Sequence, residues 1–99
     1  MMDNIKLQYL KKSLQKDGFI IDGIVGSYAR GEKNYNDIDI LYHLDEKFFN
    51  KYNGFEGFIK LDEIKQNLEK NLNEKVDIID KTTLNEIGKK YILRDIKYV

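Results

Sequence analysis

The sequence predicts an α+β (α/β) fold in which helices pack on a small mixed β-sheet. Helical and strand patterns alternate along the chain, and such alternation is typical of a sheet covered by helices. A length of 99 residues allows one small domain with a thin core, so residues 1–99 are expected to form a single domain. The chain has no Cys and no Pro, so a disulfide framework is excluded and glycine and asparagine must separate the elements.

The first third of the chain predicts a helix, a strand and a second, short helix. Leucines recur at helical spacing within residues 3–17, and lysines fill the other faces. Residues 19–25 are apolar and β-branched, which favours a buried strand. Ser27 is expected to cap a short helix that runs to about Gly31.

The middle of the chain predicts a second strand and a long helix. Residues 37–44 alternate between polar and apolar side chains and indicate a strand. Residues 45–57 give no clear period, and two glycines favour a loop there. Residues 58–72 carry one leucine and isoleucine stripe and predict a helix.

The last third predicts a strand, a helix and a final short strand. Residues 76–80 are the third strand. Thr82 or Thr83 is expected to cap a helix that ends near Leu93, and residues 96–99 can add a last strand.

Charge and hydropathy exclude several classes of protein. The 17 basic and 17 acidic residues give a formal net charge of zero. A binder of long nucleic acids needs a basic surplus, so this class is not expected. The apolar runs are too short to span a bilayer, and the first residues lack the apolar core of a signal peptide, so no membrane segment is expected. The absence of cysteine fits a cytoplasmic location.

Two carboxylates in the second strand are the strongest sign of chemistry. Asp37 and Asp39 point to one face because side chains alternate in a strand. Ile38 and Ile40 point to the opposite face and can enter the core. Two carboxylates on one face repel each other, and Mg²⁺, which prefers oxygen ligands, would relieve that repulsion. The alternative is an exposed, solvated pair at a strand end.

A glycine and a serine precede this pair at a strand-to-helix turn. Gly26 would let the backbone approach a phosphate closely, and Ser27 lies where helix amides favour an anion. Arg30 follows and can contact a phosphate in bidentate fashion. The alternatives are an ordinary turn with a serine cap, and a salt bridge from Arg30 to Glu32 or Asp37.

A third carboxylate completes the candidate site. If residues 76–80 lie beside the second strand, Asp77 joins the acidic pair, because neighbouring strands are about 5 Å apart. Three carboxylates can hold two metal ions that act on the attacking and leaving oxygens of a phosphoryl displacement. Asp80 points to the other face and is expected to be either a strand-end carboxylate without a role or a cap.

Two other features have ordinary explanations. His43 shares the face of the acids but lies further along the strand, so a partly exposed histidine without a ligand role is expected. Five aromatic residues lie between positions 48 and 58. They either pack a loop and helix start on the sheet or form an exposed apolar patch that binds a partner protein.

These motifs together resemble the minimal nucleotidyltransferase family of the DNA polymerase beta superfamily. The likeness rests on the pair Gly26-Ser27, on Asp37-Ile38-Asp39 after a spacer of nine residues, and on the strand at residues 76–79. The resemblance implies a DNA polymerase beta-like nucleotidyltransferase fold. It also implies that Gly26 and Ser27 hold the phosphates of a nucleoside triphosphate. Asp37 and Asp39 would ligate Mg²⁺, and Asp77 would complete the ion nearest the attacking hydroxyl.

The same resemblance implies a partner. Members of the family are antitoxins of helical HEPN-like toxins, and some transfer AMP from ATP to a toxin tyrosine. An Mg²⁺-dependent protein adenylyltransferase with an antitoxin role is therefore the expected function. One alternative is a non-catalytic antitoxin that binds and covers the toxin. The other is nucleotide transfer to a small molecule, for which the short chain leaves little room.

Overall fold

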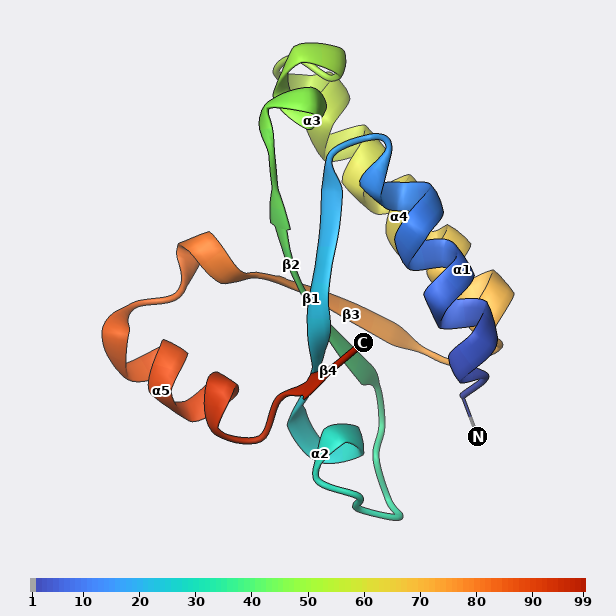
Figure 1. Cartoon of the computed structure of the whole chain (residues 1–99), viewed down its shortest axis with the longest axis vertical. Helices are drawn as coiled ribbons and strands as arrows, with labels where there is room; N and C mark the ends of the chain where they lie inside the picture. Colours follow the sequence, from blue (N-terminus) through green and yellow to red (C-terminus); the bar gives the residue numbers. More distant parts are fainter. Residues whose placement is uncertain (1) are drawn as a thin grey trace.

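The computed structural model describes residues 2–99 as a four-stranded sheet with helices on both sides (Figure 1). The helices are α1 (Asn4–Gln15), α2 (Gly26–Ala29), α3 (Glu46–Lys51), α4 (Phe55–Leu72) and α5 (Glu86–Arg94). The strands are β1 (Phe19–Val25), β2 (Ile38–Leu44), β3 (Val76–Asp80) and β4 (Lys97–Tyr98), and a 3₁₀ turn, η1 (Lys81–Thr83), follows β3. Within residues 2–99, no helix is both long enough and apolar enough to cross a membrane.

The strand order is β3-β2-β1-β4, and the sheet is mixed. β1 runs antiparallel to both of its neighbours, β2 and β4. β2 and β3 are parallel, so the chain must cross over between them, and α3 and α4 form that crossover. The predicted α+β fold with a small mixed sheet is therefore confirmed.

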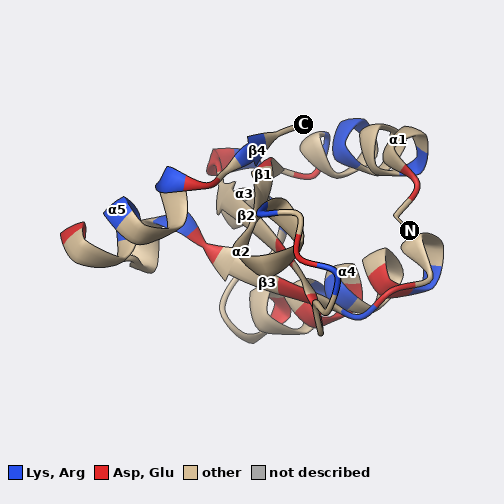
Figure 2. Ribbon diagram, turned by 90° about the horizontal axis from the view of Figure 1, so that it is seen from below, with Lys and Arg blue, Asp and Glu red and all other residues tan. Residues whose placement is uncertain are grey.

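The main core lies between one face of the sheet and the helices α1 and α4. In the end-on view of Figure 2 these two helices lie on one side of the strands, and α5 lies on the other. The apolar stripes predicted for the two long helices supply their side of this core. The buried residues on the helices are Leu7, Leu14, Ile64, Leu68 and Leu72, and those on the sheet include Phe19, Ile21, Ile38, Ile40 and Tyr42.

The second face of the sheet is covered less completely. Val25 and Leu41 are buried there. A Cβ added at Gly23 would lie 2.6 Å from the carbonyl oxygen of Lys97 and 2.8 Å from Cγ1 of Ile96, so the segment that enters β4 packs directly on this face. α5, which lies on this side, buries none of its residues fully. Part of the second face is therefore open to solvent.

The expectation of a loop over residues 45–57 is wrong, because α3 and the first turn of α4 occupy this segment. The carboxylate of Asp45 caps α3 by accepting the backbone N–H of Lys47. Phe48 is buried and ties the helix to the core. Gly54, at φ +58°, separates the two helices. A short helix fixed by one buried ring leaves little periodic signal in the sequence.

Two predicted helix caps are also wrong. Ser27 lies inside α2, whose N-cap position is the extended residue Val25 and has no side-chain cap. Thr82 and Thr83 belong to η1. The cap of α5 is Asn85, whose side chain accepts a backbone N–H of the first turn. In both places the predicted cap lies two positions from the true one: Ser27 follows Val25, and Thr83 precedes Asn85.

Candidate active site

Three carboxylates lie at the end of the sheet where β1 ends and β2 and β3 begin; α2 marks this end in Figure 2. Asp39 and Asp77 are register partners in the parallel strands, and Asp37 comes directly before β2. Ile38 and Ile40, which alternate with Asp39, are fully buried in the core. Asp39 therefore belongs to the second face, as the strand pattern predicts.

Gly26 packs directly against the carboxyl group of Asp39. Val25 is the register partner of Asp39, so the chain enters α2 beside this side chain. A Cβ at Gly26 would lie 2.3 Å from Oδ2 of Asp39, and the backbone φ of Gly26 is +79°. The close contact and the left-handed backbone both disfavour any residue with a side chain. Glycine is what allows α2 to begin this close to the acids.

The local charges act on Asp39 from several sides. Burial raises the pKa of the Asp39 carboxyl, and the negative charges of Asp77 and Asp37 raise it further. The positive charge of Arg30 acts in the opposite direction. Like charges that raise a pKa in this way disfavour the ionised form, and a bound cation would favour it. Asp37, Asp77 and Arg30 are therefore close enough for their charges to act on the Asp39 carboxyl.

Arg30 forms a salt bridge to Glu32. Its Nε lies 2.7 Å from Oε2 of Glu32, and about half of each side chain is exposed. The salt bridge to Glu32, one of the alternatives offered by the sequence, is present, and the phosphate contact of Arg30 stays a prediction. Ser27 lies in α2 and is half-buried. Gly26, Ser27 and Arg30 are therefore grouped in α2 and at its C-cap, next to the acids.

The donor chemistry of the acids suits a hard divalent cation. Asp37, Asp39 and Asp77 offer only oxygen atoms, which Mg²⁺ prefers, and the absence of a side chain at Gly26 leaves room for the Asp39 carboxylate. In the described part of the chain, residues 2–99, no three Asp, Glu or His side chains are grouped closely enough to hold a metal ion. The metal-binding role of these acids therefore stays a prediction.

Sequence reasoning missed a pair of contacting tyrosines, Tyr28 and Tyr35, beside the site. Tyr35, in the loop before β2, donates a hydrogen bond from its hydroxyl to Oε1 of Glu74 at 2.9 Å. Its ring also meets that of Tyr28 edge-on, with centroids 4.8 Å apart. Because Glu74 lies in the turn before β3, Tyr35 links the segments that carry Asp37 and Asp77. The available signal was an aromatic residue within an otherwise polar turn.

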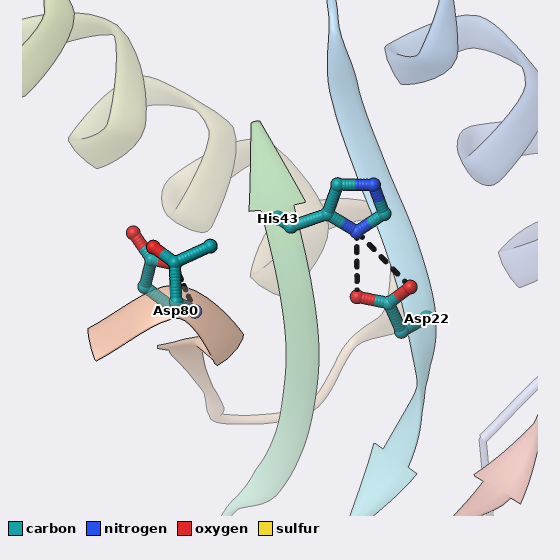
Figure 3. Close-up of polar contacts among 4 residues, drawn as sticks. Asp22, His43 and Asp80 are labelled. Atoms are coloured by element: carbon teal, nitrogen blue, oxygen red, sulfur yellow. Dashed lines mark hydrogen bonds and ion pairs between the residues drawn. The ribbon is translucent and has the colours of Figure 1, made fainter. Parts of the chain in front are cut away.

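A second polar pair lies further along the same face. Nδ1 of His43 lies 2.9 and 3.1 Å from the two carboxylate oxygens of Asp22, at a bulge in β1 (Figure 3). His43 is partly exposed, as predicted. Asp80, also drawn in Figure 3, accepts the backbone and hydroxyl protons of Thr82 and so caps η1, as expected. Neither group joins the three acids at the start of β2.

Comparison with known sequences gives consistent matches over nearly the whole chain. The profile of the nucleotidyltransferase domain family matches residues 7–98. The Methanocaldococcus jannaschii protein MJ1379, to which protein adenylyltransferase activity is ascribed, is 41% identical over 92 residues, which are 89% of this chain and 86% of that protein. The protein adenylyltransferase MntA of Thermococcus cleftensis is 30% identical over 99 residues, covering 99% of this chain and 92% of its own length.

Solved structures share the fold. A protein described as a minimal nucleotidyltransferase matches with a TM-score of 0.72 and 22% identity, over 97% of this chain and 91% of its own. A chain of a mutant MntA–HpeT toxin–antitoxin complex matches with a TM-score of 0.70 and 19% identity, over 100% and 72% of the two chains. A toxin–antitoxin structure with AMP-PNP gives 0.66 and 21%, over 98% and 72%.

Proposed function

Because this chain is a minimal nucleotidyltransferase, a member of the nucleotidyltransferase domain family, we propose that it transfers AMP from ATP to a hydroxyl group of a partner protein. The observation that carries the proposal is the acidic end of the sheet, where Asp39 and Asp77 are register partners and Gly26 packs against Asp39. Two relatives that match most of the chain are named for protein adenylyl transfer.

The same proposal extends to the partner. One similar structure is a toxin–antitoxin complex, and another contains AMP-PNP, an ATP analogue. We propose that this chain is the antitoxin of a helical, HEPN-like toxin and that the modified group is a toxin tyrosine. ATP is then the nucleotide donor, and modification of the tyrosine silences the toxin.

Five residues of the site have a proposed task. Asp37 and Asp39 would hold Mg²⁺, and Asp77 would complete the coordination of the ion nearest the acceptor hydroxyl. Two such ions, when bound, neutralise charge on the phosphates and make the hydroxyl easier to deprotonate. Gly26 and Ser27 bind the terminal phosphates through backbone N–H groups and the serine hydroxyl.

The proposed transfer is an in-line displacement. The acceptor oxygen forms a bond to the α-phosphorus of ATP, and the bond from that phosphorus to the oxygen bridging the β-phosphate breaks. The electron pair leaves with pyrophosphate, and the hydroxyl proton passes to Asp77, which is exposed and accessible to a side chain of the partner. Positioning and charge stabilisation supply most of the rate enhancement in such a reaction.

The proposal is tested by co-expressing the chain with the product of the neighbouring reading frame, as the candidate partner, and measuring the intact mass of that product. We expect an added AMP group with the parent chain and none with Asp37→Asn, Asp39→Asn or Asp77→Asn. Asp62→Asn, a change of an exposed acid on α4, is the matched control and should leave the transfer intact.

Three outcomes separate the alternatives. If all three variants at the acidic end still modify the partner, the site assignment is wrong. A partner that is silenced but unmodified would favour a non-catalytic antitoxin. An unmodified partner together with nucleotide transfer to an aminoglycoside would favour a small-molecule nucleotidyltransferase.

A further inference from the structure

Large apolar side chains are exposed on α3 and at the start of α4. These two segments lie at the end of the sheet opposite to α2 (Figure 1). The exposed fractions are 59% for Phe49, 85% for Phe55, 73% for Phe58 and 61% for Ile59. We call these four residues the aromatic surface. Together they expose about 500 Å² of side chain, since a large apolar side chain presents roughly 150–250 Å². Contiguous patches of this size on a monomer are often functional.

A hollow of about 330 Å³ lies in the aromatic surface. Its walls include the rings of Phe48, Phe49 and Phe58 and the side chain of Leu61. Asp80 is the one charged residue in its lining. The hollow can accept a large apolar side chain whose neighbour carries a positive charge.

The charged residues that line the hollows are mostly negative. A second hollow beside the first, of about 230 Å³, is lined by Glu56, Glu63 and Lys60 together with apolar residues. Lys60 is directed toward the ring of Tyr52, with its Nζ 5.3 Å from the centroid. With Asp80, the linings of the two hollows hold three carboxylates and one ammonium group. A basic segment is the electrostatic complement of such a surface.

We propose that the aromatic surface docks an amphipathic, basic helix of the partner protein. A large apolar side chain of that helix fills the 330 Å³ hollow, and Lys or Arg residues beside it face Asp80, Glu56 and Glu63. The identification of this partner with the acceptor of AMP rests on the proposed function, whereas the docking itself does not.

A second copy of this chain fits the surface less well. A symmetric pair would bring identical acidic linings toward each other, which like charges disfavour. The aromatic surface also offers about 500 Å² per copy, whereas a stable interface buries roughly 800 Å² per partner. A helix set into a groove needs less area because a few side chains carry most of its binding energy.

Docking and chemistry are then separated along one strand. Leu44, which lines the larger hollow, follows Asp39 by five residues in β2, a distance along the strand of roughly 16 Å at 3.3 Å per residue, and the two side chains point to opposite faces of the sheet. A partner held at the aromatic surface can present a hydroxyl from another segment to the acidic end. Loss of docking therefore raises the KM for the partner and leaves the kcat at saturation unchanged.

The test uses calorimetry to measure binding of the product of the neighbouring reading frame, which is the candidate partner. Phe58→Ser, which removes an exposed ring from the larger hollow, should weaken binding at least about tenfold and leave the melting temperature unchanged. Ile87→Ser is the matched control, because Ile87 is 71% exposed on α5 and lies outside the aromatic surface. It should bind as the parent does.

The outcomes distinguish docking from catalysis. Asp39→Asn should bind the partner with the parent's affinity and transfer no AMP. If the parent transfers no AMP and Phe58→Ser still weakens binding, the proposed function fails and the docking proposal stands. The docking proposal is overturned if the parent does not bind, or if Phe58→Ser binds as tightly as the parent. It is also overturned if Phe58→Ser only abolishes self-association in light scattering.

Discussion

At the start of β2 the chain brings like charges together, whereas at the end of the same strand it brings aromatic rings together. Asp37, Asp39 and Asp77 share the first region, and the raised pKa of Asp39 means that the fold disfavours its charged form. In the second region Phe48 is buried and packs against Phe49 and Tyr52. The negative charge of Asp39 therefore lowers the stability of the fold, whereas the buried ring of Phe48 raises it.

The two ends of β2 should therefore respond differently to substitution. The acidic end is held in place by the rest of the sheet, so it can lose one charge without unfolding. Substitutions there should mainly reduce AMP transfer. A region that is buried on the inside and exposed on the outside should respond in two ways. Its inner rings should affect stability, and its outer rings should affect only binding.

The largest expected effect is that of Phe48→Ala. The ring of Phe48 is 2% exposed, and its centroid lies 5.0 Å from that of Tyr52. Its removal should lower the free energy of unfolding by about 3–5 kcal/mol, as the loss of other buried rings does. Urea denaturation measures this change. Phe55→Ala, at a position that is 85% exposed, is the control and should change it by less than about 0.5 kcal/mol. Equal effects of the two variants would contradict the division into inner and outer rings.

The next effect concerns Gly26→Ala at the acidic end, with Gly31→Ala as the matched control. Both glycines have φ +79°, but a Cβ at Gly26 would meet Asp39, whereas a Cβ at Gly31 would meet no atom within 4 Å. Both variants should lose about 1 kcal/mol of stability through backbone strain. Only Gly26→Ala should displace the carboxyl of Asp39 and reduce AMP transfer, by about a hundredfold.

Stability and transfer are both measured for these two variants, and the comparison decides the role of the contact. If Gly31→Ala reduces transfer as much as Gly26→Ala, the conformation of the turn matters and the contact with Asp39 does not. If neither variant reduces transfer, α2 does not position the acidic end.

The sequence predicted the elements whose signal is periodic and local. The alternation in residues 37–44 and the apolar run in residues 19–25 identified β2 and β1, and the pairing of Asp39 with Asp77 followed once β3 was placed beside β2. α3 was missed because one buried ring, Phe48, fixes it, and a single tertiary contact has no period.

Within the site, sequence reasoning could not specify the contacts between residues that are far apart in the sequence. The hydrogen bond from Tyr35 to Glu74 spans 39 positions, so no local pattern reveals it. The partner of Arg30 was left open between Glu32 and Asp37, because spacing alone does not choose between two nearby acids.

A smaller effect is expected from Tyr35→Phe, which removes the hydrogen bond to Glu74 and keeps the ring against Tyr28. A looser loop before Asp37 should lower the kcat of AMP transfer about two- to fivefold. Tyr9→Phe, at a position that is 79% exposed on α1, is the control. Unchanged transfer by Tyr35→Phe would remove the tyrosine pair from the positioning of the site.

The contribution of the Tyr35–Glu74 hydrogen bond to stability should also depend on pH. The hydrogen bond to Glu74, with burial and the charge of Glu74, raises the pKa of Tyr35 above its ordinary value of 10.0. A raised pKa means that the folded state favours the protonated hydroxyl, so this contribution is complete below pH 10 and is lost as the pH rises through the folded-state pKa. The stability difference between the parent and Tyr35→Phe should therefore shrink above that pH.

The smallest effect has the opposite sign, because Asp39→Asn should stabilise the chain. It removes a charge that burial, Asp77 and Asp37 all disfavour. The gain in chelator-containing buffer is expected to be about 0.5 kcal/mol, since much of the group is exposed and screened by solvent. Asp62→Asn, at an exposed position on α4, is the control and should give no gain.

The pH dependence of this gain follows from the raised pKa of Asp39. A folded state that holds the proton more tightly is destabilised by ionisation, so the advantage of Asp39→Asn is present at neutral pH and disappears as the pH falls through the folded-state pKa. Mg²⁺ should reverse the order, because an ion that binds the folded parent stabilises it and has one ligand fewer in the variant. If Mg²⁺ raises the melting temperature of both proteins equally, Asp39 is not a metal ligand. Metal binding by Asp39 would then not explain why the fold brings these like charges together.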